Sequence, residues 1–377
     1  MIRKLIPLLL CLLCLFGFGA ASARAEDAVW DLSAASAEEL EQRFLEALED
    51  ESVQRIDLGS GEAEDGRIPW ETLAHLRAAR PELEVDYEFT LCGCRFTLDD
   101  TVMDLRRREI SDQGALVRRI APCMPNLRTL DMDSCGVDDE HMAAIRDALP
   151  QVNVVWRIWF GDRTGGLAGY SVRTDVERIL ASNPGIGGEL TPENTQSLKY
   201  CTRVKYLDLG HNSYLRSLDF VRYMPDLELL IVAMGDWYDL SPLEGCEKLV
   251  YAELQTSAVS DLRPLTKLKN LKHLNFGWCF ALHDITPLYE MTQLERLWIG
   301  CLTPVPDEQI ERMRELVPGC VIETEINDPT DAGWRYLGHT EWGETIVDPT
   351  YQWVRDMMHY SEGNYAYAYP YNDPLLY

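Results

Sequence analysis

Basic side chains are scarce in this sequence. Its 35 lysines and arginines stand against 62 aspartates and glutamates, which gives a formal net charge of −27. A surface this acidic repels phosphate backbones, so we expect no nucleic-acid partner. The same charge favours solubility and is compatible with cationic ligands.

The motifs of several enzyme classes are also missing. The chain has seven histidines but no His-Glu-x-x-His motif and no glycine-rich phosphate loop. His211, His273 and His283 are near one another in repeat spacing, yet no activated serine or cysteine motif accompanies them. We therefore expect no enzymatic activity, no cofactor and no metal site.

Long apolar runs are confined to the N-terminus. Arg3 and Lys4 precede an apolar stretch at 5–18, and small residues at 23–25 precede Glu26, which predicts a signal peptide over residues 1–25. The stretch is short for a bilayer span and no longer one follows. We expect a secreted or cell-surface protein without membrane insertion. Removing residues 1–25, with three basic side chains and no acid, would change the formal charge from −27 to −30.

The cysteines do not have the pattern of a disulfide framework. Of the 11 cysteines, nine would remain after signal removal, which is an odd number. Most occupy positions that other repeats fill with packing or turn residues, so we interpret them as buried thiols. Cys92-Gly-Cys94 stands apart. It fits a hairpin better than a redox site, and its oxidation state is left open.

One pattern, apolar-x-x-apolar-x-apolar, occurs five times between Val204 and Ile299. The copies start at Val204, Leu227, Leu249, Leu271 and Leu294, so successive starts are 23, 22, 22 and 23 residues apart. A fixed period of this length is typical of a leucine-rich-repeat solenoid. Turns of the type Leu-Ser-Pro-Leu, first seen at 240–243, follow the strands, and their proline suits the first position of a short helical turn.

The N-terminal half carries longer repeats. An amphipathic helix, a proline and an alternating strand recur around Pro81, Pro150 and Pro318. We expect a helix with a capping box at Ser36–Asp50, a short helix near Val172–Leu180, and another that starts at Asp348-Pro349. The expected organisation is a signal peptide at 1–25, an N-terminal cap with longer repeats at 26–160, a connecting segment at 161–199, short repeats with a C-terminal helix–strand cap at 200–327, and a partly mobile, tyrosine-rich tail at 328–377.

These motifs resemble known leucine-rich repeats. The copies with Leu-Ser-Pro-Leu turns resemble the internalin type, and the helix–proline–strand copies resemble the ribonuclease-inhibitor type. Phrases such as those at 206–212, 294–300 and 328–335 resemble exported leucine-rich-repeat proteins of Gram-positive bacteria over roughly residues 50–327 and the start of the tail. The resemblance implies an α/β right-handed solenoid, or horseshoe, with a parallel sheet on its concave face and short helices or turns on its convex face. It implies binding, usually to protein, and names no ligand. The weak asparagine ladder and the irregular turns at 212–217 and 235–239 depart from the family pattern.

Candidate binding residues follow from strand geometry. Adjacent strands lie about 4.8 Å apart, so side chains at one repeat position form rows across the concave face. The rows and adjoining turns give these candidate ligand-binding residues: Tyr206, Asp208, Tyr251, Glu253, His273, Asn275, Arg296, Trp298, Trp237 and Trp278. Tyr206, Tyr251 and Trp298 are the strongest because their positions require exposure, whereas Trp237 and Trp278 also fit a packing role at the turns.

We therefore predict a non-catalytic binding module that recognises a protein or peptide partner on its concave face. One alternative is a carbohydrate or cell-wall-binding protein that stacks sugars on the same aromatic residues. Another is a scaffold for an unrecognised hydrolase site at 161–190 or in the tail.

Overall fold

The computed structural model describes residues 28–164, 169–182, 188–300, 302–325 and 334–360. The expected signal peptide at 1–25 and the tyrosines after Tyr360 lie outside these residues. The chain divides into two compact units, residues 1–89 and 90–377. Whether the expected limits at 25, 160, 199 and 327 delimit domains stays a prediction. Among the described residues, no helix is both long and apolar enough to cross a bilayer.

The first unit contains strands β1 (Ala28–Asp31) and β2 (Val53–Glu62), which pair in parallel, and helices α1 (Ala37–Glu49) and α2 (Trp70–Ala79). The Ser36 hydroxyl accepts a hydrogen bond from the Glu39 N–H at 3.3 Å, which confirms the expected helix start. Leu40 and Phe44 of α1 are fully buried. Between β2 and α2, η1 (Ala63–Asp65) makes one 3-10 turn.

Strand β3 (Glu84–Leu91) alternates buried and less buried residues, as its sequence predicts. Cys92 and Gly93 both have positive φ, 49° and 73°, and connect β3 to β4 (Cys94–Thr97). Positive φ at both central residues is the geometry of a tight hairpin turn. The hairpin interpretation of Cys92-Gly-Cys94 is confirmed, because β3 and β4 are neighbours in one sheet.

After β4, the second unit contains a three-stranded parallel sheet of β5 (Val102–Asp104), β6 (Thr129–Asp131) and β7 (Asn153–Val155). Helices α3 (Ala115–Ile120) and α4 (Asp139–Ala148) connect these strands, with the 3-10 turn η2 (Ala121–Cys123) after α3. Strands β8 (Arg157–Phe160) and β9 (Tyr170–Arg173) form an antiparallel hairpin. The prediction of a short helix near Val172–Leu180 is wrong, because the end of β9 and strand β10 (Arg178–Leu180) lie in this stretch.

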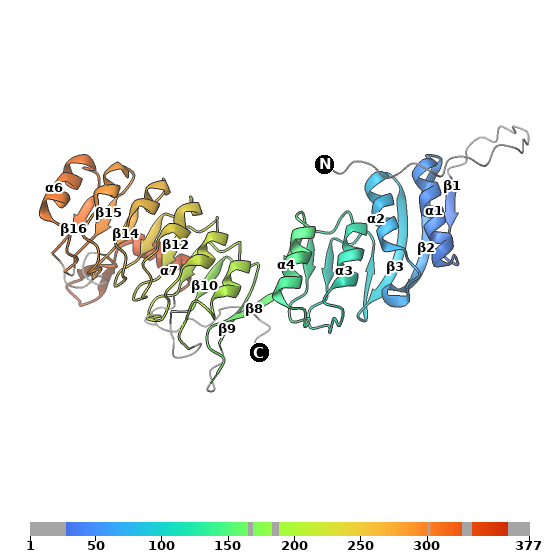
Figure 1. The fold of residues 1–377 in the computed structure, drawn as a ribbon, viewed down its shortest axis with the longest axis horizontal. Helices are drawn as coiled ribbons and strands as arrows, with labels where there is room; N and C mark the ends of the chain where they lie inside the picture. The colour runs from blue at the N-terminus through green and yellow to red at the C-terminus, as the bar shows by residue number, and fades with distance from the viewer. Residues whose placement is uncertain (1–27, 165–168, 183–187, 301, 326–333, 361–377) are drawn as a thin grey trace, which may run out of the picture. The chain divides into compact units, whose positions relative to one another are not determined.

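A seven-stranded parallel sheet follows in the order β10 to β16 (Figure 1). After β10 its strands are β11 (Tyr206–Asp208), β12 (Leu229–Ile231), β13 (Tyr251–Glu253), β14 (His273–Asn275), β15 (Arg296–Trp298) and β16 (Val321–Glu323). The third motif positions pair with one another from Tyr206 to Arg296, so the register predicted from the repeat period is confirmed.

Helical turns connect these strands on the other side of each repeat. They are η3 (Gln196–Tyr200), η4 (Asp219–Tyr223), η5 (Ser241–Gly245), η6 (Arg263–Lys267), η7 (Thr286–Glu290) and the cap helix α6 (Asp307–Leu316). The prolines of η5, η6 and η7 lie in the first turn, as expected. The motif leucines of successive repeats are fully buried between sheet and helical turns and form the core.

In three repeats, the side chain eight residues after the motif start bonds a carbonyl oxygen of the bending backbone. Asn212 Nδ2 donates to the carbonyl oxygens of Ala181 and Leu209, both at 2.9 Å, and the Ser257 hydroxyl donates to Leu254 O at 2.8 Å. Cys279 holds the same place with its thiol 3.6 Å from Leu254 O. The interpretation of this cysteine as a turn residue is confirmed.

The chain continues through β17 (Tyr336–His339), β18 (Thr345–Val347) and α7 (Pro349–Met358). Asp348 caps α7 by accepting the Thr350 and Tyr351 N–H groups, as the Asp-Pro signal predicts. Residues 334–360, here called the C-terminal segment, are therefore an ordered part of the second unit.

Candidate binding site

The strand face of the seven-stranded sheet, defined by the third and fifth motif positions, is the surface on which the sequence places its candidate residues. Tyr251 is fully buried and Trp298 is 3% exposed. Buried with them are Asp208, Glu253, His273 and Asn275, whereas Tyr206 and Arg296 are half-buried. The expectation that this face is open to solvent is wrong.

The C-terminal segment covers the strand face. Tyr351, Val354 and Met358 of α7 belong to one buried cluster with residues of the sheet, which are Leu229, Ile231, Tyr251 and Trp298. Figure 1 shows α7 beside the strands of this sheet. The apolar side chains that the sequence assigns to a partner are thus satisfied within the chain, because α7 presents a matching apolar stripe.

Trp334 of the C-terminal segment also covers the strand face through two aromatic contacts. The Trp334 ring lies 5.5 Å from the Tyr251 ring and 6.0 Å from the Trp298 ring, measured between centroids. Trp334 is itself 1% exposed. These edge and tilted contacts are the geometries that aromatic pairs prefer.

Glu253 is the polar centre of the covered face. Its carboxylate accepts hydrogen bonds from the Tyr251 hydroxyl, from Trp334 Nε1 at 2.9 Å, from Arg335 Nε at 3.0 Å, and from a second Arg335 nitrogen. Gln255 Nε2 lies 3.4 Å from its other oxygen. The bidentate arginine and the two neutral donors satisfy a carboxylate that is fully buried.

The ionisation of this centre follows from its contacts. Burial alone would raise the pKa of Glu253, but the adjacent Arg335 guanidinium holds that pKa below its usual value. Burial would lower the pKa of Arg335, yet Glu253 raises it well above the ordinary range. Burial and the neighbouring carboxylate raise the pKa of Tyr251 well above 10.0, so this hydroxyl stays protonated and donates.

Further polar bonds fix both ends of the C-terminal segment. Arg296 Nη1 lies 2.9 Å from Asp348 Oδ1, and its Nη2 donates to Trp334 O at 2.8 Å. At the other end, the Tyr360 hydroxyl donates to Asp208. Two of the candidate residues, Asp208 and Arg296, therefore hold the chain's own C-terminal segment in place.

The two turn tryptophans differ. Trp237 is fully buried, and its Nε1 donates to Val232 O at 2.9 Å, so it packs within the turn. This bond replaces the turn bond that the repeat lacks at Gly235. Trp278 is half-buried.

A cavity of about 270 Å³ lies where the strands β11–β14 end. His211, Met234, Thr256 and Trp278 line it from four successive turns and share left-handed φ values of 55–64°. Non-glycine residues take this conformation at a cost, here offset by inter-repeat hydrogen bonds such as His211 N–H to Ala233 O at 2.9 Å. Further lining comes from Asp208 and Gln255 on the sheet side, and from Arg335, Tyr351 and Tyr360 of the C-terminal segment.

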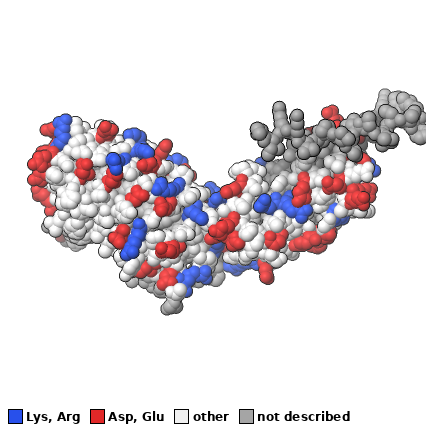
Figure 2. All heavy atoms as spheres, viewed as in Figure 1, with Lys and Arg blue, Asp and Glu red and all other residues white. Residues whose placement is uncertain are grey.

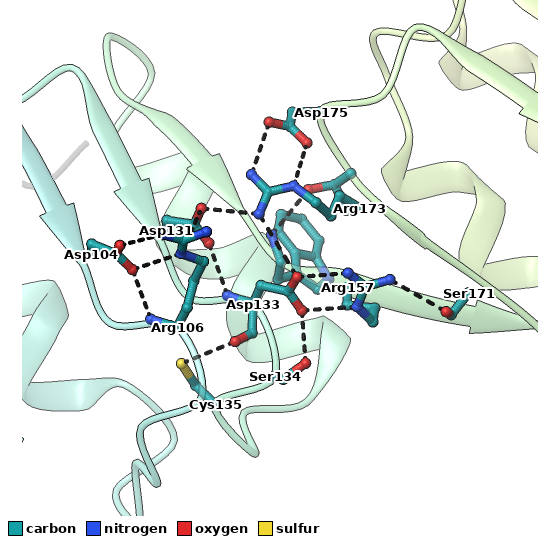
Figure 3. Close-up of polar contacts among 12 residues, drawn as sticks. Asp104, Arg106, Asp131, Asp133, Ser134, Cys135, Arg157, Ser171, Arg173 and Asp175 are labelled. Carbon is teal, nitrogen blue, oxygen red and sulfur yellow. Dashed lines mark hydrogen bonds and ion pairs between the residues drawn. The ribbon is translucent and has the colours of Figure 1, made fainter. Parts of the chain in front are cut away.

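A second covered strand face lies on the three-stranded sheet (Figure 3). Arg157 of β8 binds Asp133 with both ends of its guanidinium, at 3.0 and 2.8 Å. Arg173 of β9 lies 3.0 Å from Asp131 and also pairs with Asp175. Although burial raises the pKa of Asp133, Arg157 lowers it below the usual value. This network holds the β8–β9 hairpin over β6.

Burial determines the protonation of several His and Cys side chains in the repeats. Searched over the described residues, the structure has no group of three or more His, Cys, Asp or Glu side chains that could hold a metal ion. Burial lowers the pKa of His273 to about 4, with Arg296 adding to the shift, so this imidazole is neutral at pH 7. Burial raises the pKa of Cys201, Cys246 and Cys279, which keeps these thiols protonated and unreactive.

Sequence reasoning missed Trp334, Arg335, Tyr351 and Tyr360, which come from the segment expected to be a partly mobile, tyrosine-rich tail. Trp334 and Arg335 are the last two residues of the segment at 328–335, which carries part of the resemblance to exported leucine-rich-repeat proteins. That resemblance was the one sequence feature that could have pointed to them. Whether the ten candidate residues contact an external ligand stays a prediction.

No family model and no curated protein matches this chain. Among solved structures, an internalin C2 from Listeria monocytogenes is similar over 59% of this chain and 80% of its own, at 14% identity and a TM-score of 0.30. An internalin F from the same species matches over 78% and 89%, at 17% identity and a TM-score of 0.33. A leucine-rich-repeat protein from Leptospira interrogans matches over 72% and 90%, at 14% identity and a TM-score of 0.27. The register of β10–β16 and the helical turns of 22–23-residue repeats make the second unit a leucine-rich-repeat solenoid.

Proposed function

We propose that this chain is a secreted or cell-surface recognition protein, not an enzyme, that binds a protein or peptide partner. The fold supplies an ordered surface of stacked turns, and the predicted signal peptide supports export. Because the C-terminal segment covers the strand face, the proposed contact surface is the post-strand edge, defined as the turns that follow β11–β15.

The observation that carries this proposal is a set of exposed apolar side chains on the post-strand edge. They are Tyr214, Met234, Tyr238, Phe280 and Leu302, which range from 44% to 76% exposed. These side chains come from the turns after β11, β12, β14 and β15. Neighbouring strands lie about 4.8 Å apart, so this edge of five strands is about 20 Å long. Exposed apolar surface of this kind marks interaction sites on soluble proteins.

The charged side chains, unlike the exposed apolar ones, do not gather in one region of a single sign on the face in view. Figure 2 shows acidic and basic side chains interspersed over the viewed face of the repeats. Exposed ion pairs between neighbouring repeats, such as Lys267 with Glu244 and Lys248 with Asp226, contribute to this mixture. The proposal therefore rests on apolar contact, and we expect binding to persist when salt screens surface charges.

The test is capture of partners from secreted and cell-envelope fractions by the immobilised chain at low and high salt. A variant with Tyr214→Ser, Tyr238→Ser and Phe280→Ser should retain at least tenfold less of any specifically captured protein. Tyr223→Ser is the matched control, because this tyrosine is 52% exposed but lies on η4 on the helical side. Equal capture by the triple variant and the wild type would count against the proposal, and capture of glycans alone would favour the carbohydrate alternative.

A further inference from the structure

The cavity at the ends of β11–β14 has in its wall a buried carboxylate without a paired cation. Asp208 is 5% exposed, and it accepts hydrogen bonds from the Tyr360 hydroxyl and from the Gly210 N–H, the latter at 2.9 Å. Within the described part of the chain, no lysine or arginine forms an ion pair with it, and Arg335 pairs with Glu253 instead. A buried carboxylate loses hydration, and a cation in the cavity would offset that loss.

Neutral acceptors line the same cavity. Gln255 is 3% exposed, and its Oε1 has no hydrogen-bond partner among the described residues. Its Nε2 faces Glu253, so exchanging the two amide atoms would place oxygen against carboxylate and is disfavoured. The buried Thr256 hydroxyl oxygen is also unpaired within the described residues. Unpaired buried acceptors of this kind are costly unless a donor reaches them.

Most of the remaining wall is apolar or aromatic, although Ser182, His211 and Arg335 also line it. Ile231 and Met234 line one part, and Trp278, Tyr351 and Tyr360 provide rings. Aromatic faces attract cations and also pack against methylene groups. The cavity thus combines one carboxyl group, neutral acceptors and an apolar wall, whereas its arginine is engaged by Glu253.

We propose that this cavity binds a primary ammonium group carried on a short unbranched apolar chain, such as a lysine side chain or a simple alkylamine. An ammonium group has three donors and no acceptor, which matches the acceptors of Asp208, Gln255 and Thr256. Residues 361–377 contain no lysine or arginine, so these residues supply no cationic side chain. The inference rests on the proposed recognition function and adds the chemical class that one part of the surface selects.

The first experiment measures the binding of n-butylammonium by ligand-observed NMR or calorimetry, with choline as the donor-free cation of comparison. The wild-type chain should bind n-butylammonium at least tenfold more tightly than choline. Asp208→Asn should weaken that binding tenfold or more, since it removes the charge and keeps the shape. Asp236→Asn is the control, because this exposed aspartate lies in the adjoining turn outside the cavity, and it should leave binding unchanged.

Asp208 also holds Tyr360, so its replacement could loosen the C-terminal segment. A lowered Tm of Asp208→Asn would identify that case. The variants Gln255→Met and Thr256→Val then test the cavity instead, and each should weaken n-butylammonium binding threefold or more. Absence of n-butylammonium binding, equal binding of choline, or full binding by all folded cavity variants would overturn the inference.

A second pair of probes identifies the source of the ammonium group. Blocked Gly-Lys-Gly and its norleucine analogue differ in the charged group alone. Tighter binding of the lysine peptide than of n-butylammonium would assign the cavity to a protein partner, and weaker binding would assign it to a free amine. Equal binding of the norleucine peptide would overturn the proposal. Partner capture by the variant with Tyr214→Ser, Tyr238→Ser and Phe280→Ser is measured separately. Failure of the recognition function can therefore be distinguished from failure of the ammonium site.

Discussion

At the residue scale, carboxylates on the strand faces determine how those faces are covered. Asp133 and Glu253 are both buried, and each is bound by two nitrogens of an arginine from a later segment, Arg157 and Arg335 respectively. Leaving such a carboxylate buried without its arginine would cost several kcal/mol. Each covering segment therefore brings its own cation, and the sequence of the covering segment is coupled to the sequence of the repeats.

His273 provides a prediction at this scale. Its folded pKa is about 4, because burial and the nearby Arg296 and Lys272 outweigh Glu295 and Asp348. The unfolded pKa is close to 6.5, so between these values the unfolded state binds more protons, and stability falls as pH is lowered. We expect a loss of up to about 3 kcal/mol in the free energy of unfolding between pH 6.5 and 4.

Urea unfolding at a series of pH values measures this effect. His273→Gln should flatten the curve in that window, whereas His211→Gln, at an exposed turn position, should not. The folded pKa of Glu253 is lowered, so the stability that this group contributes is lost only at pH values below the usual glutamate pKa. An unchanged pH profile in His273→Gln would refute the assignment to His273.

At the scale of elements, the sequence predicts the strands and helical turns that recur in every short repeat. The spacing of the motif starts gives the strand register, and the prolines give the helical turns, since both depend on contacts between residues one repeat apart. The same local reasoning failed at 172–180, where β9 and β10 pair with other strands. Pairing partners of these two strands, and not local preference, decide the structure there.

The turn after β12 supports a second prediction. A Cβ on Gly235 would lie 2.5 Å from the Trp237 ring, and that ring is fully buried and bonded to Val232 O. Gly235→Ala should therefore lower the free energy of unfolding by about 1–3 kcal/mol. Gly245→Ala is the matched control, because a Cβ there meets nothing within 4 Å, and it should be neutral within about 0.5 kcal/mol. Equal Tm values for the two variants would contradict the proposed clash.

At the scale of the whole molecule, the covered strand face is the feature that sequence reasoning could not supply. Trp334 and Glu253 are 81 residues apart in sequence, and no periodic pattern connects them. The alternation within β13 predicts that Tyr251 points away from the leucine core, and it does pack against Trp334 and Tyr351 of the C-terminal segment. It does not say whether solvent or another segment meets that side chain, because tertiary contact alone decides this.

The last prediction tests whether Arg335 holds the C-terminal segment on the sheet. Arg335→Met leaves Glu253 buried without its cation, and we expect a loss of about 3–5 kcal/mol. Arg263→Met is the control, since Arg263 forms an exposed pair with Asp261 and should cost less than about 1 kcal/mol. Hydrogen exchange should become faster in α7 before it does in β11–β13, because the repeats keep their leucine core when the segment leaves.

A double variant separates charge from packing. Combining Arg335→Met with Glu253→Leu removes both buried charges, so it should recover part of the stability lost in Arg335→Met. If the double variant were instead less stable by the sum of two independent losses, the ion pair would not be what fastens the segment. The apolar contacts of Tyr351, Val354 and Met358 would then carry the attachment by themselves. Faster exchange confined to α7 in Arg335→Met would also show that the strand face can be uncovered while the solenoid stays folded, which is the condition for any partner to reach Tyr251 and Trp298.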